Sequence, residues 1–160
     1  MDHKKCSGLS TVAALLVLAV FAVGIVGVLL SGVSAYQRLT QRDQAAYDSR
    51  TAAQYLTTKL RQASGSGAVS MGSFGAGDAL IIGEEWEGVS FVTRIYCHNG
   101  WLMELYSLAE GAFSPEDGQK VIPMDSLQIH QQEQLLTLTL THGQQSRQVL
   151  FALEEGEVQP

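Results

Sequence analysis

Charge is absent from a long stretch near the start of this sequence. Between Lys5 and Arg38 there is no charged residue, and residues 9–30 are almost entirely apolar. Because an α-helix rises about 1.5 Å per residue, this run is long enough to cross a hydrocarbon core of about 30 Å. The sequence therefore predicts a transmembrane helix over residues 9–35, preceded by a basic head at residues 1–8.

Cysteine is also scarce. The chain has two cysteines, Cys6 and Cys97, and a transmembrane helix between them excludes a disulfide, whose Cα atoms lie within roughly 7 Å of each other. His, Cys and acidic side chains do not recur at the spacings of a metal site. We expect Cys97 to be a free thiol buried in a strand, and we expect no metal or other cofactor.

Basic residues are few in the second half of the chain. Residues 78–160 hold three Lys or Arg against thirteen Asp or Glu, whereas residues 1–61 hold seven against three. An acidic surface repels phosphate groups, so this composition argues against nucleic acid or anionic lipid as a partner of the distal domain.

The apolar run has a second interpretation, as a cleaved secretory signal. Val33-Ser34-Ala35 before Tyr36 has the small-x-small form that signal peptidase accepts. The run is longer than the roughly 7 to 15 apolar residues of a signal, which favours a retained single-pass anchor in the cell membrane. Basic residues flank the span on both sides, so the positive-inside rule does not fix its orientation. The short basic head favours a cytoplasmic N-terminus and an extracytoplasmic distal domain.

A stripe of small residues runs along one face of the predicted span. Gly24, Gly27, Ser31 and Ala35 follow one another at offsets of three and four residues. Such stripes let a second helix approach closely in lipid. Gly and Ser are also simply frequent in membrane helices, which is the alternative interpretation.

A more polar helix is expected to continue the span over residues 36–63, which contain no Pro and no Gly. Its second half is amphipathic: Tyr55, Leu56 and Leu60 recur near helical spacing and form the helical surface available to cover a sheet. Residues 64–78 are rich in glycine and show no periodicity, so they are predicted to be a connector that ends the helix.

Short β-prone runs separated by turns make up an acidic antiparallel β domain over residues 79–160. The predicted strands are residues 79–82, 89–98, 101–108, 127–131, 134–142 and 147–153. Asn99-Gly100 is the strongest hairpin signal, because both residues tolerate positive φ. Leu alternates with Thr over residues 136–141, which predicts a strand with one buried face. The predicted fold class is α+β, with the long N-terminal helix packed on one small antiparallel sheet.

This order of elements resembles that of type IV pilins and of the minor pseudopilins of secretion and competence systems. The likeness covers the whole chain in architecture, and residues 49–63 (SRTAAQYLTTKLRQA) look like the second half of the long helix in minor pilin-like proteins. The chain also looks like an uncharacterised family of pilin-like proteins from Gram-positive, clostridia-type bacteria. The resemblance implies a structural, non-enzymatic subunit whose partners are the lipid bilayer and other pilin-like subunits, contacted through the N-terminal helix.

The resemblance also implies a candidate processing site. In that family a prepilin peptidase cuts after a Gly that follows basic residues, and Lys4-Lys5-Cys6-Ser7-Gly8 followed by Leu9 is similar. The family's main subunits place a Glu at the fifth residue after the cut, where this sequence has Ala13. Some tip subunits lack that Glu. The departure is consistent with a minor or initiating component, or with a chain that is not processed at Gly8.

Two other classes of function stay open at this point. A membrane-tethered extracytoplasmic binding or sensing domain that does not polymerise fits the same features. An exported enzyme would depend on His98, His130 and His142 together with Asp125. These residues lie in or beside strands, where solvated or hydrogen-bonded side chains are ordinary, and their spacing indicates no paired acid and base. We therefore expect no catalytic activity.

The length of the apolar run predicts that the chain stays in the membrane fraction after carbonate extraction, because about 20 apolar residues are enough to span a bilayer. Immunoblotting of the extracted membranes measures this. Recovery of a soluble form that begins at Tyr36 would establish the signal-peptide interpretation instead.

Overall fold

The computed structural model describes residues 3–63 and 69–153. Within these residues the chain forms one helix, α1 (His3–Ala63), followed by eight strands. The strands are β1 (Val69–Phe74), β2 (Gly77–Trp86), β3 (Val89–His98), β4 (Trp101–Leu108), β5 (Gln119–Pro123), β6 (Ser126–Gln132), β7 (Leu135–His142) and β8 (Gln145–Ala152). The predicted α+β fold class, a long N-terminal helix followed by antiparallel β structure, is confirmed.

The chain divides into two compact units, with the boundary between Gln41 and Arg42. In the first unit, the residues of α1 from Thr11 onward are all exposed, including large apolar side chains such as Leu16 and Phe21. This part of α1 is long and apolar enough to cross a membrane. Large apolar side chains exposed around the whole helix are typical of a membrane span, so this part of α1 is a candidate membrane anchor.

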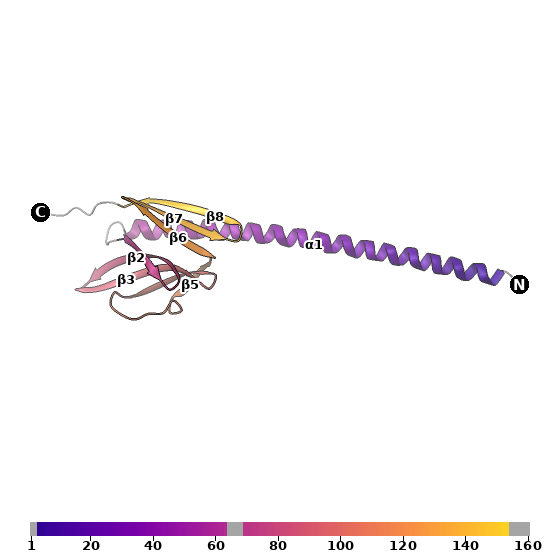
Figure 1. Cartoon of the computed structure of the whole chain (residues 1–160), viewed down its shortest axis with the longest axis horizontal. Helices are drawn as coiled ribbons and strands as arrows, with labels where there is room; N and C mark the ends of the chain where they lie inside the picture. The colour runs from indigo at the N-terminus through magenta and orange to yellow at the C-terminus, as the bar shows by residue number, and fades with distance from the viewer. Residues whose placement is uncertain (1–2, 64–68, 154–160) are drawn as a thin grey trace. The chain divides into compact units, whose positions relative to one another are not determined.

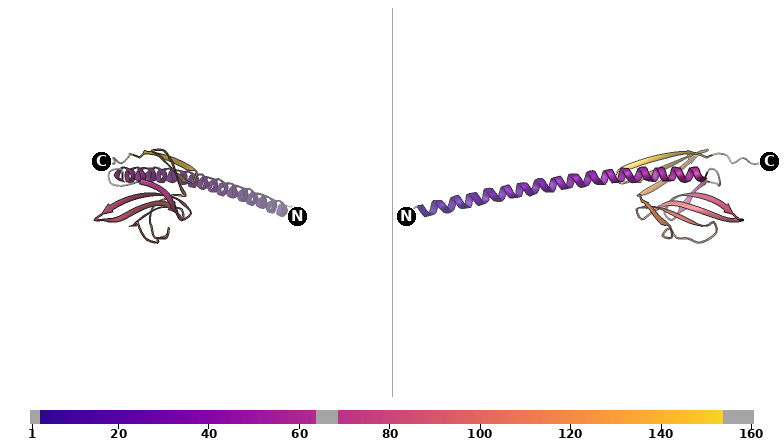
Figure 2. Two further views of the ribbon diagram at one scale, coloured as in Figure 1. Left: turned by 60° about the vertical axis from the view of Figure 1, so that its left-hand side comes forward. Right: turned by 180° about the vertical axis from the view of Figure 1, so that it is seen from behind.

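The second unit, from Arg42 onward, contains two antiparallel sheets and the last turns of α1. One sheet has five strands in the order β1-β2-β3-β4-β5, and the other has three in the order β6-β7-β8. Figure 1 and Figure 2 show β7 and β8 on one side of these helical turns, and β2 and β3 on the other. The prediction of one sheet was therefore wrong. The β6 strand pairs with β7 and not with β5, so the sheet is interrupted between Pro123 and Ser126.

The structure also corrects the bounds of the predicted connector, residues 64–78. Residues 69–74 form β1, and β2 begins at Gly77, so only residues 64–68, which lie outside the described residues, remain between helix and sheet. Gly72 faces Ala79 in the β1–β2 ladder, and Ile81 occupies the space that a side chain at Gly72 would fill. Glycine is compatible with a strand at this position because the neighbouring isoleucine packs over it.

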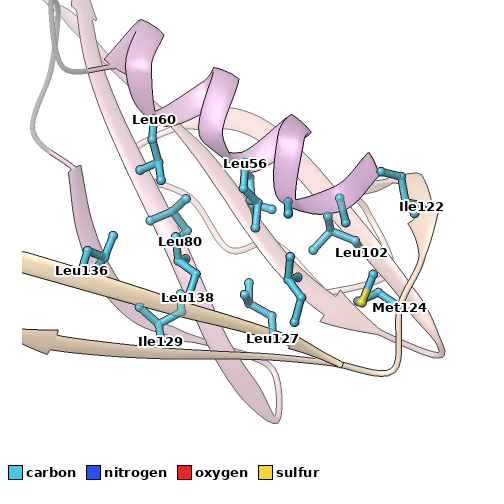
Figure 3. Close-up of a cluster of buried hydrophobic side chains, with 14 residues drawn as sticks. Leu56, Leu60, Leu80, Leu102, Ile122, Met124, Leu127, Ile129, Leu136 and Leu138 are labelled. Atoms are coloured by element: carbon cyan, nitrogen blue, oxygen red, sulfur yellow. The ribbon is translucent and has the colours of Figure 1, made fainter. Parts of the chain in front are cut away.

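The main core lies between the last turns of α1 and both sheets. Figure 3 shows Leu56 and Leu60 pointing from the helix towards leucines of the sheets. Both are fully buried, as are Leu80 of β2, Leu102 of β4 and Leu138 of β7. Tyr55 is half-buried against the same cluster. The stripe Tyr55, Leu56 and Leu60 predicted to contact the sheet therefore does so, and it contacts two sheets.

A smaller core covers the other face of the five-stranded sheet. Tyr96 and Met103 are buried there, and Phe113 of the β4–β5 loop packs on them. The Tyr96 hydroxyl donates a hydrogen bond of 2.8 Å to the Pro115 carbonyl. The loop is thereby fixed over the sheet, and the five-stranded sheet is buried on both faces along its middle.

The carboxylate of Asp78 links the two sheets. Asp78 of β2 accepts a hydrogen bond of 2.8 Å from the backbone N–H of Ile129 in β6. This donor belongs to an edge strand of the three-stranded sheet, since β6 pairs only with β7 among the described strands. The bond fixes the position of β6 beside β2 and satisfies a polar backbone group next to the core.

We predict that Leu56→Ala lowers the free energy of unfolding of the second unit by about 2–5 kcal/mol, because it removes a fully buried side chain from the junction of three layers. The matched control is Leu150→Ala, since Leu150 is 64% exposed on β8 and its loss changes little. Denaturant unfolding of the full chain in detergent, followed by near-ultraviolet circular dichroism, measures both. Equal effects of the two substitutions would contradict this placement of the core.

Candidate functional site

Two groups of polar side chains join the helix to the strands of the second unit, and the first is centred on Glu104 of β4. Its carboxylate accepts a hydrogen bond from the Tyr55 hydroxyl and forms an ion pair of 2.5 Å with the Lys59 ammonium. Burial, and then the hydrogen bond and the negative charge of Glu104, raise the pKa of Tyr55. Tyr55 therefore stays a neutral donor, and one carboxylate binds two successive turns of α1 to the middle of β4.

The second group is centred on His142, the last residue of β7. Its Nε2 lies 3.8 Å from a carboxylate oxygen of Asp48, and its Nδ1 lies 3.4 Å from one of Asp125. Asp48 is buried in α1 and also accepts a hydrogen bond of 3.0 Å from Gln44. Asp125 accepts a hydrogen bond of 2.7 Å from the Gly143 N–H. The imidazole thus stands between one carboxylate of the helix and one of the β5–β6 turn.

The predicted constellation of three histidines and Asp125 is only partly assembled. The structure brings His142 and Asp125 together, and it adds Asp48, which sequence reasoning missed. His98 instead contacts the Asn99 side chain at 2.9 Å, and His130 is exposed on β6. Over the described residues, no group of three His, Cys, Asp or Glu side chains is placed to hold a metal ion.

The small-residue stripe lies on the anchor. Gly24, Gly27, Ser31 and Ala35 are all exposed in α1, and a methyl group added at either glycine would meet nothing within 4 Å. The Ser31 hydroxyl donates a hydrogen bond of 2.9 Å to the Gly27 carbonyl, so it is satisfied within its own helix. The stripe is an open, shallow face on which a second helix can pack closely.

The candidate processing site lies near the start of α1. The backbone of Gly8 and Leu9 is helical, while the side chains there fall outside the described residues.

A family comparison covers the junction between helix and strands. A protein family described as a Domain of unknown function (DUF4860) matches residues 47–143, which is more than half of the chain. The chain belongs to this family. No curated protein and no solved structure matches it.

The DUF4860 match runs from Tyr47 in α1 to Gly143, directly after β7. It therefore contains both polar groups at the junction, including Asp48 and His142, together with the core stripe of the helix. The apolar part of α1 that can span a membrane lies before it. The DUF4860 region thus contains the core stripe of α1 and strands β1 to β7, whereas β8 (Gln145–Ala152), the last strand of the three-stranded sheet, follows it in the chain.

Cys97 of this DUF4860 head lies in β3 beside the main core, where it is partly buried and not fully buried as the sequence predicted. It forms no disulfide with any residue that the structure describes. Burial, and then the negative charge of Asp125, raise the pKa of Cys97 to about 12. A thiol with this pKa is almost entirely protonated at neutral pH and reacts slowly, because the thiolate is the nucleophile.

We predict that, in a Cys6→Ser variant, Cys97 is alkylated by iodoacetamide at pH 8 on the order of a thousandfold more slowly than free cysteine, in proportion to its smaller thiolate fraction. Denaturant should remove this protection. Mass spectrometry after timed quenching measures the modified fraction. Rapid labelling of the folded protein, or a Cys97-linked dimer on a non-reducing gel of intact cells, would contradict the assignment of a partly buried, protected free thiol.

Proposed function

We propose that this DUF4860 protein is a non-enzymatic, single-span pilin-like or pseudopilin-like subunit of a type IV filament or of a secretion or competence assembly. The observation that carries the proposal is the difference between the two halves of α1. The helix is exposed and predominantly apolar from Thr11 to Ala35, and its last turns are buried on one side in an antiparallel head. This is the architecture that the resemblance to pilin-like proteins implies.

The chemistry of the head supports a structural role over catalysis. Two of its half-buried carboxylates bind other parts of the fold: Glu104 binds two side chains of α1, and Asp78 binds β6. The Asp48–His142–Asp125 group occupies the same junction. We therefore assign the polar side chains at this junction to fixing the helix, and we propose no substrate and no cofactor for them.

The orientation and the partners follow from the same proposal. The basic residues before the span remain in the cytoplasm, and the acidic head lies outside the membrane. Other pilin-like helices pack against the stripe Gly24, Gly27, Ser31 and Ala35, and processing, where it occurs, takes place between Gly8 and Leu9. A membrane-tethered binding or sensing domain that does not polymerise is the alternative that the experiment below distinguishes.

We predict that Gly27→Leu damages assembly and spares insertion. Close approach of helices in lipid depends on small residues, because hydrophobic attraction between helices is weak there, whereas insertion depends on summed hydrophobicity, which Leu increases. A Cβ at Gly27 would meet no described atom within 4 Å beyond the backbone of its own helical turns, so the substitution leaves the fold intact. Site-specific photo-cross-linking along the span should show cross-links to a second helix in the wild type and at least a fivefold lower yield in the variant.

The matched control is Leu16→Ile, which keeps the volume and apolarity of an exposed span residue. It should leave the cross-link yield unchanged. If the wild-type span gives no cross-links, or if Gly27→Leu leaves them unchanged, α1 is only an anchor and the tethered-domain alternative replaces this proposal.

A further inference from the structure

His142 presents both of its ring nitrogens to carboxylates. Its Nε2 lies 3.8 Å from Oδ2 of Asp48 in α1, and its Nδ1 lies 3.4 Å from Oδ1 of Asp125 in the β5–β6 turn. The Nδ1 atom is buried and makes no hydrogen bond to any residue that the structure describes. Each ring nitrogen therefore has an anionic oxygen as its neighbour. We call Asp48, Asp125 and His142 the histidine bridge.

The charge state of the imidazole decides how many of these carboxylates it can bind. A neutral imidazole carries one N–H donor and one lone pair, whereas the imidazolium carries two N–H donors. In either neutral tautomer of His142, the lone pair of one nitrogen would face a carboxylate oxygen, and two acceptors repel each other. The two-sided arrangement is therefore complementary to the protonated side chain and not to the neutral one.

Asp48 is the more buried of the two carboxylates. It is 6% exposed, and Gln44 donates a hydrogen bond of 3.0 Å to its Oδ1. Its Oδ2 faces Nε2 of His142. A carboxylate that is removed from water loses hydration energy, and a neighbouring cation offsets that loss. Protonation of His142 places such a cation beside Oδ2.

Other ionisable groups lie on the elements that pack against the histidine bridge. They are Arg42, Asp43 and Arg50 of α1, Cys97 of β3 and Arg147 of β8. The arginines and Asp43 are exposed, and within the described part of the chain none of them forms an ion pair with the bridge. Cys97 is neutral, since burial and the charge of Asp125 raise its pKa. Histidine ordinarily titrates between pH 5 and 8, so His142 is the member of the bridge whose charge changes there.

The histidine bridge lies at one end of the contact between α1 and the strands. Ala45 is the first buried residue of α1 among those whose burial the structure describes. Gly143 directly follows His142, and a methyl group added there would lie 3.8 Å from the Cβ of Ala45. The core residues Leu56 and Leu60 lie further along the helix. Loosening of the bridge would therefore open the β7–β8 turn locally and leave the core intact.

We propose that the histidine bridge is a pH-sensitive contact that holds the β7–β8 turn on α1. When His142 is protonated, the imidazolium binds Asp48 on one side and Asp125 on the other. When His142 is neutral, one of these contacts is lost, and the turn separates more readily from the helix. The bridge therefore stabilises the closed turn at lower pH, and this contribution is lost as the pH rises and His142 releases its proton. The inference does not depend on the proposed function, because it applies equally to an assembled subunit and to a tethered domain.

The test is hydrogen–deuterium exchange of the full chain in detergent micelles at about pH 5.5 and about pH 8, on either side of the range in which histidine titrates. Each rate is divided by that of an unstructured chain at the same pH. The amides of residues 141–145 report opening of the turn, and they include the Gly143 N–H that Asp125 binds. They should be about fivefold better protected at the lower pH, as expected for two partly exposed ion pairs. The amides of residues 56–60, in the core, should show no such difference.

Matched variants assign the pH difference to the bridge. His142→Gln removes the titrating group and should abolish the difference. His130→Gln makes the same substitution at an exposed histidine of β6 and should leave the difference unchanged. Asp125→Asn keeps an acceptor for the Gly143 N–H and should reduce the difference to about twofold, because one of the two carboxylates is lost. Asp125 is 54% exposed, so this variant tests the bridge without disturbing buried packing. Circular dichroism of each purified variant checks that it folds.

Three results would overturn this inference. The first is equal protection of residues 141–145 at both pH values in the wild type. The second is better protection at the higher pH, which would show that the neutral imidazole is the form that closes the turn. The third is an equal pH difference in the wild type and in His142→Gln, which would assign the difference to another group. None of these results bears on the span cross-links that test the proposed function.

Discussion

The buried stripe of α1 is the constraint on which the head depends. Ala52, Leu56 and Leu60 are fully buried, and they contact leucines of both sheets in one core. Without these helical turns, the apolar faces of the five-stranded and the three-stranded sheet would lose their shared cover. Each fully buried Leu stabilises the folded state by about 1.5–3 kcal/mol relative to an exposed one, so the head and the end of the helix form a single folding unit. The same helix is apolar and exposed nearer its start. One helix therefore carries both the candidate membrane anchor and the stripe that the core of the head requires.

Polar contacts then fix the position of the helix against the two sheets. Glu104 binds Tyr55 and Lys59 on the side of the five-stranded sheet, and His142 approaches Asp48 on the side of the three-stranded sheet. Buried or half-buried polar groups add less net stability than apolar packing, but they penalise wrong registers strongly, because a shifted helix would leave them unpaired. These polar contacts of the DUF4860 head therefore lie where the helix meets the strands.

The sequence predicted the elements that short-range signals determine. The bounds of β3 and β4 match because Asn99-Gly100 fixes the turn, and both residues have the positive φ that this turn requires. The buried positions of Leu56 and Leu60 followed from helical spacing. The strand β1 was missed because it contains a glycine and lies in a segment whose composition is typical of a loop. The strand β5 was missed because it is short and ends at Pro123. The division into two sheets depends on long-range pairing, which alternation within one strand does not encode. Asp48 and Glu104 were missed for the same reason, although Asp48 lies one turn before Ala52 beside the buried stripe.

The central claim is that this anchored head belongs to an assembly of helices and does not act as an isolated domain. The most direct measurement is immunoblotting of surface material sheared from the native cells, compared with the membrane fraction of the same cells. The account predicts that the chain is present in the sheared, sedimentable fraction, and that Gly27→Leu removes it from there while membrane levels stay unchanged. A chain found only as a membrane monomer, with none in the sheared fraction, would contradict the account.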